Sequence, residues 1–254
     1  MAELLRLVHV SYSYPGIGDK TPALRDVSFS VMEGEFVAII GPGGCGKSTL
    51  LSLLAGLLLP DCGCIYINGT SHKGSGKSIG YMLQTDQLID WQNKLTRVAA
   101  NREEQKKLAD NNYVQINEGM NSYGLITFID TYPSGNSECI RQRAALIRSL
   151  LKEPDILLMD EPFSAHPKDI RLAVADDIWQ MLRNEKKTVV LVAGDIEEAI
   201  CMADRVIILS PSPGTVIGSF ELPLLGKAGK PSAVRKSPEF SSYYEAISKS
   251  YSSL

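Results

Sequence analysis

The segment from Gly41 to Ser48 has the residue types and spacing most directly tied to chemistry. It reads Gly-Pro-Gly-Gly-Cys-Gly-Lys-Ser and satisfies the pattern G-x-x-x-x-G-K-[ST]. Glycines let successive backbone N–H groups converge on a phosphate, and a helix that begins there adds a favourable dipole. Lys47 is expected to reach the β- and γ-phosphates, and the Ser48 hydroxyl to bind Mg²⁺. The alternative is a glycine-rich turn that only starts a helix. Under the first interpretation the residues that contact ATP here are Gly41, Pro42, Gly43, Gly44, Cys45, Gly46, Lys47, Ser48 and Thr49.

A second string, Gly74 to Ser78, looks similar but predicts something else. Ser71 stands where the pattern requires its first glycine, five positions before Gly76. The string also leads into an expected strand and not into a helix. We interpret it as a solvated loop.

Two carboxylates follow an apolar run at Ile156–Met159. Asp160 and Glu161 then fall at the carboxyl end of an expected strand, where parallel sheets bind their ligands. Asp160 is expected to hold Mg²⁺ through water, and Glu161 to orient or deprotonate the water that attacks the γ-phosphate. Alone, an apolar run ending in Asp-Glu is common in protein cores and loops. Because this chain also contains the phosphate loop, the functional interpretation of Asp160 and Glu161 is favoured.

Strands and helices alternate around these motifs. The pattern indicates an α/β fold on a largely parallel sheet, with a mostly helical insert between Gln84 and Leu151. Apolar and aromatic residues recur in steps of three or four between Phe240 and Tyr251, which predicts an amphipathic helix that packs on the domain. A membrane-surface role is the alternative for that helix. Strands are expected at 4–14, 24–32, 35–40, 64–68, 78–83, 155–159, 188–193 and 205–209, and helices at 47–58 and 168–185.

Composition is that of a folded globular protein. Of the 254 residues 44% are hydrophobic and 22% charged, and the formal net charge of −3 argues against a nucleic-acid partner. The five cysteines have no metal-ligand spacing, which suits a reducing compartment. Cys62 and Cys64 are interpreted as structural residues at a turn. No apolar run is long enough to span a membrane and no signal peptide is evident, so we expect a cytoplasmic protein that meets the membrane through a partner.

From Leu4 to about Phe240 the chain resembles the ATP-binding subunits of ABC transporters, in the importer branch for nitrate, sulfonate and taurine-like solutes. The resemblance implies a P-loop NTPase (RecA-like) core with an antiparallel β subdomain and an inserted α-helical subdomain. It divides the chain into a nucleotide-binding core at 1–83 and 152–225, a helical signature subdomain at 84–151 and a C-terminal tail at 226–254. Besides the phosphate loop, the matching segments are Ala23–Val31, Gly80–Gln84, Arg141–Leu146, Asp160–Ala165, Asp195–Ile200 and Ala203–Val206.

The resemblance also assigns roles outside the phosphate loop. Tyr14 falls where the family stacks an aromatic ring on adenine, although a buried strand tyrosine is the alternative. Gln84 is expected to touch Mg²⁺ and the attacking water, and the segment Gln84–Trp91 to face a membrane permease. Ser137 is expected to contact nucleotide. The catalytic residues implied are Glu161, Gln84 and Lys47, and the Mg²⁺ ligands are Ser48, Gln84 and Asp160.

Three departures from the family pattern fall on functional positions. The signature glycines are missing, and Glu138 puts a carboxylate where the γ-phosphate should dock. Gly194 stands in place of the switch histidine, a loss of the kind that costs ~10²–10³ in kcat. In the loop after Glu161, His166-Pro167 replaces Leu-Asp, and proline has no N–H to donate. We expect binding of ATP to persist and turnover to be impaired.

The main functional prediction is an ATPase subunit that binds Mg-ATP, dimerises around it and drives solute import through a permease, with a solute-binding protein as an indirect partner. Because two copies of this chain would put damaged signatures at both ATP sites, a heterodimer with a competent second subunit is favoured over a homodimer. The alternative is a non-hydrolytic or weakly hydrolytic regulatory partner. An ABC protein of repair or translation is a third possibility.

Overall fold

The structure, a computed structural model, describes residues 2–16, 19–72, 79–82, 149–150, 153–164 and 168–252. Several predicted features lie outside these ranges. They are the helical insert with Gln84, Ser137 and Glu138, the permease-facing segment that ends at Trp91, and His166-Pro167.

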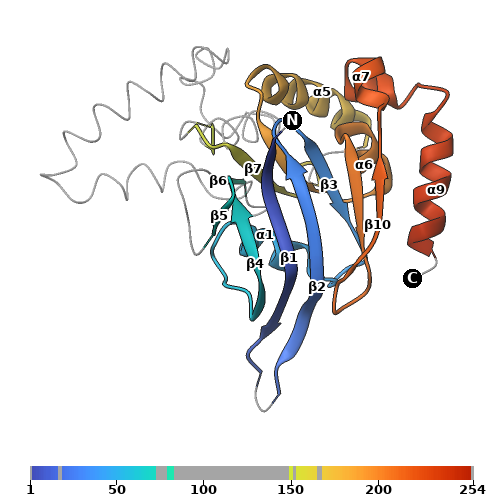
Figure 1. The fold of residues 1–254 in the computed structure, drawn as a ribbon. Helices are drawn as coiled ribbons and strands as arrows, with labels where there is room; N and C mark the ends of the chain where they lie inside the picture. The colour runs from blue at the N-terminus through green and yellow to red at the C-terminus, as the bar shows by residue number, and fades with distance from the viewer. Residues whose placement is uncertain are drawn as a thin grey trace, which may run out of the picture.

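A six-stranded sheet forms the centre of the molecule, in the order β10-β9-β3-β8-β7-β6 (Figure 1). The strands β9, β3, β8, β7 and β6 run parallel, and β10 pairs antiparallel with β9. Their bounds are β3 Phe36–Ile40, β6 Ile79–Met82, β7 Ile156–Asp160, β8 Thr188–Val192, β9 Arg205–Leu209 and β10 Val216–Glu221.

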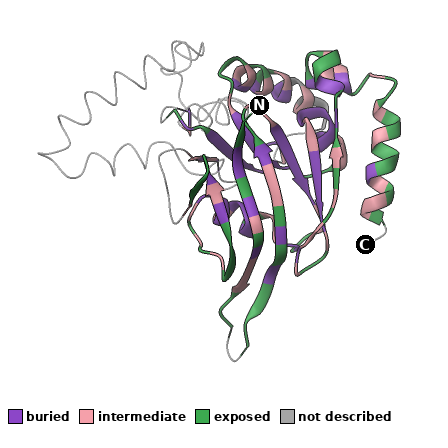
Figure 2. Ribbon diagram, viewed as in Figure 1, coloured by how far each residue is buried: buried purple, intermediate pink, exposed green. Residues whose placement is uncertain are grey.

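A smaller four-stranded antiparallel sheet, ordered β2-β1-β4-β5, packs beside it. The β1–β2 hairpin extends beyond the rest of the fold, and exposed residues alternate with buried ones along it (Figure 2). This alternation is typical of a sheet with one face in water. The strands are β1 Glu3–Tyr14, β2 Thr21–Met32, β4 Cys62–Ile67 and β5 Thr70–Ser71.

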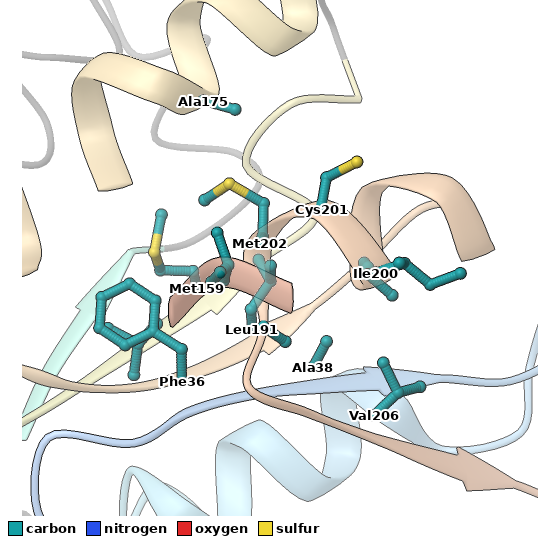
Figure 3. Close-up of a cluster of buried hydrophobic side chains, with 14 of the residues drawn as sticks. Phe36, Ala38, Met159, Ala175, Leu191, Ile200, Cys201, Met202 and Val206 are labelled. Atoms are coloured by element: carbon teal, nitrogen blue, oxygen red, sulfur yellow. The ribbon is translucent and has the colours of Figure 1, made fainter. Parts of the chain in front are cut away.

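Helices cover both faces of the central sheet, which explains why β3, β7 and β8 are predominantly apolar and are buried along their whole length. Ala38, Met159 and Leu191 pack toward α5 and α6, where Figure 3 shows Ala175 and Cys201 close by. Alternate strand residues pack on the other face against α1 and the small sheet. The helices are α1 Lys47–Leu54, α5 Lys168–Asn184, α6 Ile196–Met202, α7 Leu224–Ala228, α8 Pro231–Val234 and α9 Phe240–Ser252.

The helix expected near the C-terminus is present as α9. It lies beside α6, and Ile247 is fully buried in the core while Tyr244 is 41% exposed. Among the described residues, no helix is long and apolar enough to cross a membrane.

Most strand predictions are confirmed to within a few residues, but the first helix was predicted too long. Instead of continuing to Leu58, α1 ends at Leu54, because Gly56 adopts a left-handed φ of 69° and turns the chain away. Leu57 is consequently 62% exposed. The placement of Cys62 and Cys64 at a turn was also wrong: both lie in strand β4, where they are exposed.

Candidate nucleotide-binding site

The loop Gly41–Gly46 joins the carboxyl end of β3 to the amino end of α1. Gly46 is the N-cap residue of α1, and none of the side chains that the structure describes caps the helix. The N–H groups of the first turn therefore point out of the helix end without a side-chain acceptor, as an anion-binding helix start requires.

Close packing explains two of the loop's glycines. A Cβ at Gly46 would lie 2.8 Å from both the Ala23 carbonyl oxygen and Leu24 Cδ2, and its φ is +101°. A Cβ at Gly41 would lie 2.6 Å from the Cys45 sulfur. Gly44 differs, because it has a left-handed φ of +76° but no described residue within 4 Å of its Cβ position.

Lys47 closes over the loop from its end. Its Nζ donates to the carbonyl oxygens of Gly41 at 2.8 Å and Pro42 at 3.1 Å. The ammonium group is thus held on the loop itself. Cys45 is fully buried, and burial raises the pKa of its thiol although the charge of Lys47 lowers it in part. Only the backbone of Cys45 is therefore available to a ligand.

Asp160 ends β7 next to the start of α1. Its side chain is 6% exposed, and burial raises its pKa, while a hydrogen bond from the Ser48 hydroxyl and the charge of Lys47 pull the pKa down. Ser48 and Asp160 thus place a hydroxyl and a buried carboxylate together. These are hard oxygen ligands of the type that Mg²⁺ prefers, and a cation would compensate the buried charge, so the residues fit this metal.

Glu161 follows in a strained backbone conformation. Its φ is +44°, unusual for a residue with a side chain. Its N–H continues the sheet by donating to Val192 O at 3.0 Å, and its own carbonyl accepts from the N–H and hydroxyl of Ser164 at 3.2 and 2.9 Å. These bonds fix the turn that presents Glu161 beside Asp160.

Tyr14 ends β1 near α1. Its side chain is 42% exposed, and its hydroxyl is 3.1 Å from Thr49 Oγ1. The alternative of a buried strand tyrosine is therefore wrong. An exposed ring beside the phosphate loop is compatible with the adenine role, which stays a prediction. The Thr49 hydroxyl is engaged by Tyr14.

Sequence reasoning missed the contribution of Tyr81. This residue of β6 is hydrogen-bonded to Ser52 of α1, and burial together with the nearby charge of Asp160 raises the pKa of its phenol to about 12. Tyr81 thus stays neutral, on the strand that pairs with β7. Its place three residues before Gln84 was a signal, but its proximity to Asp160 depends on the sheet order.

Gly194, the residue in place of the switch histidine, follows β8 and is exposed. Its N–H donates to Glu198 Oε2 at 3.3 Å. Within the described part of the chain, a Cβ there would meet only Glu198 Oε2, at an ordinary 3.6 Å. The described residues therefore leave room for a larger side chain at this position.

The site combines the strand β3, a glycine-rich loop on which Lys47 is held, the start of α1 and a carboxylate pair at the end of β7, which is separated from β3 by β8 in the same sheet. This combination defines a phosphate-loop nucleotide-binding protein. Comparison with known proteins narrows the class. Residues 24–164 match the ABC transporter family. The chain is 37% identical over 250 residues to an uncharacterised ABC transporter ATP-binding protein of Bacillus subtilis, covering 98% of this chain and 96% of that one.

Two further relatives carry names that specify a solute. A taurine import ATP-binding protein of Pelagibacter ubique is 32% identical over 91% of this chain and 88% of its own length. A nitrate import ATP-binding protein of Synechocystis is 32% identical over 96% of this chain and 93% of its own. Among solved structures, the chain is similar to the dimeric ATP-binding cassette MJ0796, which was solved in a post-hydrolysis state bound to ADP and Pi. The two superpose with a TM-score of 0.66 at 26% sequence identity, and the match covers 86% of this chain and 99% of that one.

The chain belongs to the ABC transporter family, as an ATP-binding subunit. It is therefore a member of a family of ATP-binding ATPases, and the fold class expected from the resemblance is confirmed. The comparisons support the main functional prediction and lend no support to the regulatory alternative.

Proposed function

We propose that this subunit binds Mg-ATP between the Gly41–Ser48 loop and Asp160-Glu161 and couples ATP hydrolysis to the import of a small oxyanion. The observation that carries the proposal is the juxtaposition of Lys47, Ser48 and Asp160 at one edge of the central sheet. The oxyanion class is supported by the names of two relatives, since taurine carries a sulfonate and nitrate is itself an oxyanion.

Each residue has a defined task in this site. The loop N–H groups and Lys47 bind the phosphates, and Tyr14 stacks on adenine. Ser48, Asp160 and Gln84 hold Mg²⁺, which supplies charge neutralisation at the phosphates when bound. Glu161 orients the attacking water through its carboxylate, and Ser164 stabilises the backbone turn that contains Glu161. Ser137 contacts the nucleotide of the opposite subunit.

The partners follow from the same proposal. A relative solved as a dimer supports association of two ATPase subunits, and the departures at Glu138 and Gly194 favour a heterodimer with a competent second subunit. The segment Gln84–Trp91 contacts a membrane permease, which places the subunit on the cytoplasmic face of the membrane. A solute-binding protein delivers the solute to the permease.

Reconstitution of the subunit with its permease in vesicles tests the proposal. ATP-dependent uptake of labelled taurine and of nitrate is measured with the wild-type subunit and with Glu161→Gln. We expect uptake of one of these oxyanions that Glu161→Gln abolishes while ATP binding is retained. Uptake that is unaffected by Glu161→Gln would contradict the assigned role. Native mass spectrometry of the purified complex distinguishes the heterodimer from two copies of this chain.

A further inference from the structure

Glu198 is a buried titratable residue to which the proposed chemistry assigns no task. It lies in the first turn of α6 and is only 8% exposed. Its Oε2 accepts the Gly194 N–H, while its Oε1 is buried and has no hydrogen-bond partner within the described part of the chain. A buried carboxylate oxygen without a donor is costly when charged, so this position favours a bound proton.

The charged groups around Glu198 come from three elements. Asp195, the N-cap residue of α6, and Glu161, after β7, both oppose a negative charge on Glu198, whereas Arg171 of α5 favours it. The neighbouring Glu197 is paired with Arg235. The β3 strand beneath α6 contributes only apolar residues.

Hydrogen bonds connect this residue to the turn that holds Glu161. Arg171 donates to Asp195 Oδ2 and to the Ser164 carbonyl oxygen, both at 3.3 Å. Ser164 in turn bonds the carbonyl of Glu161, and Asp195 Oδ1 accepts the Glu198 N–H at 2.7 Å. The turn after β7 and the start of α6 therefore form one hydrogen-bonded unit.

A small cavity lies against this unit. Its volume is about 50 Å³, and its charged lining consists of Arg171, Asp195, Glu197 and Glu198. This volume accommodates a few water molecules. Glu198 therefore lies against a space that is large enough to hold water.

We propose that Glu198 is a positioning residue of the nucleotide site, which holds the Gly194 segment against the Glu161 turn and takes up a proton when Mg-ATP binds. The proposal rests on the proposed function, since it requires ATP in the site beside Glu161. Mg-ATP is a net anion, and its arrival makes the charged form of Glu198 less favourable.

The protonation of Glu198 at neutral pH determines how the affinity for Mg-ATP changes with pH. Burial raises the pKa of Glu198 to about 7, so both forms are populated at neutral pH. If bound Mg-ATP raises this pKa further, binding of the nucleotide takes up a fraction of a proton. By linkage, the affinity for Mg-ATP then falls as the pH rises from 6 to 8. A capping carboxylate with a purely structural role would titrate identically with and without nucleotide.

Titration calorimetry of the full chain with Mg-ATP measures this uptake directly, in buffers of different ionisation enthalpy at pH 6, 7 and 8. The variants are Glu198→Gln, which keeps an acceptor oxygen, and Glu185→Gln, a matched change of an exposed glutamate beyond α5. We expect wild type and Glu185→Gln to take up a fraction of a proton and to lose about twofold to fivefold in affinity across this range, for a pKa shift of half to one unit. Glu198→Gln should lose this component. Protonation of the nucleotide itself is common to all variants and cancels in the comparison.

A second variant tests the direction of the effect. Arg171→Gln removes the charge that favours ionised Glu198, so the pH-dependent step should move to higher pH. Equal proton uptake in wild type and Glu198→Gln, with Mg-ATP bound by both, would overturn this inference and leave the proposed function intact. A wild-type chain that binds Mg-ATP no better than Lys47→Ala would overturn both.

Discussion

The three glycines in the middle and at the end of the phosphate loop are predicted to differ sharply in their tolerance of a methyl group. Gly43→Ala adds a Cβ with no atom of the described residues within 4 Å and at an ordinary φ. Gly44→Ala likewise meets none of these residues but must adopt a φ of +76°. Gly46→Ala combines a φ of +101° with contacts of 2.8 Å to a carbonyl oxygen and a leucine methyl.

These differences translate into an order of stability. Gly43→Ala should leave the free energy of unfolding within about 0.5 kcal/mol of wild type. A left-handed alanine costs roughly 1–2 kcal/mol, which is the expected loss for Gly44→Ala. Overpacking adds about 1–3 kcal/mol, so Gly46→Ala should lose about 2–5 kcal/mol. At about 2–4 °C per kcal/mol, the melting temperature of Gly46→Ala falls by roughly 4–20 °C.

Urea unfolding followed by circular dichroism measures the three variants against wild type. Gly43→Ala is the matched control for a methyl group on the same loop. Equal stability of Gly44→Ala and Gly46→Ala would refute the reasoning, because it would mean that Ala23 and Leu24 do not press on the loop as the structure shows.

Three further predictions concern other parts of the fold. Gly194→His should raise ATP turnover by about 10²-fold, because a Cβ fits there at 3.6 Å from Glu198 Oε2 and the histidine restores a preorganised hydrogen-bonding group. Unchanged turnover in a phosphate-release assay would favour a binding module. The pKa of Glu198 is about 7 in the folded state against 4.5 ordinarily, so the folded state binds this proton more tightly than the unfolded state. The free energy of unfolding should therefore fall by roughly 3 kcal/mol as the pH rises from about 4.5 to 7, and then level off. Urea titrations across this range should show that slope in wild type and not in Glu198→Gln. Asp204→Ala should lower stability by about 2 kcal/mol in the same assay, because Asp204 accepts from Arg183 and from the Phe36 N–H; Asp204→Asn, which keeps one acceptor, should lose less.

The parts of the site predicted from sequence are those set by local pattern. The spacing from Gly41 to Ser48 requires no tertiary information, because strand, loop and helix are consecutive in the chain. The position of Asp160 could also be predicted from the sequence, because an apolar run that ends in carboxylates places them at the end of a strand.

The parts that were missed depend on packing between distant segments. The proximity of Tyr81 to the charge of Asp160 follows from the pairing of β6 with β7, which no local pattern specifies. Glu198 has no distinguishing signal in the sequence, where it is one of two adjacent glutamates, and only its burial and the neighbouring charges of Asp195 and Glu161 account for its raised pKa. Strand β10 was not predicted, because its residues are only half-buried or exposed and its hydrophobic signal is weak.

The central claim is that the Gly41–Ser48 loop and Asp160 bind Mg-ATP. Equilibrium binding of a fluorescent ATP analogue to the purified chain tests it most directly, with and without Mg²⁺ and with Lys47→Ala as the comparison. The account predicts saturable, Mg²⁺-dependent binding that Lys47→Ala abolishes without changing the melting temperature by more than a few degrees. Binding of equal strength in wild type and Lys47→Ala would contradict it.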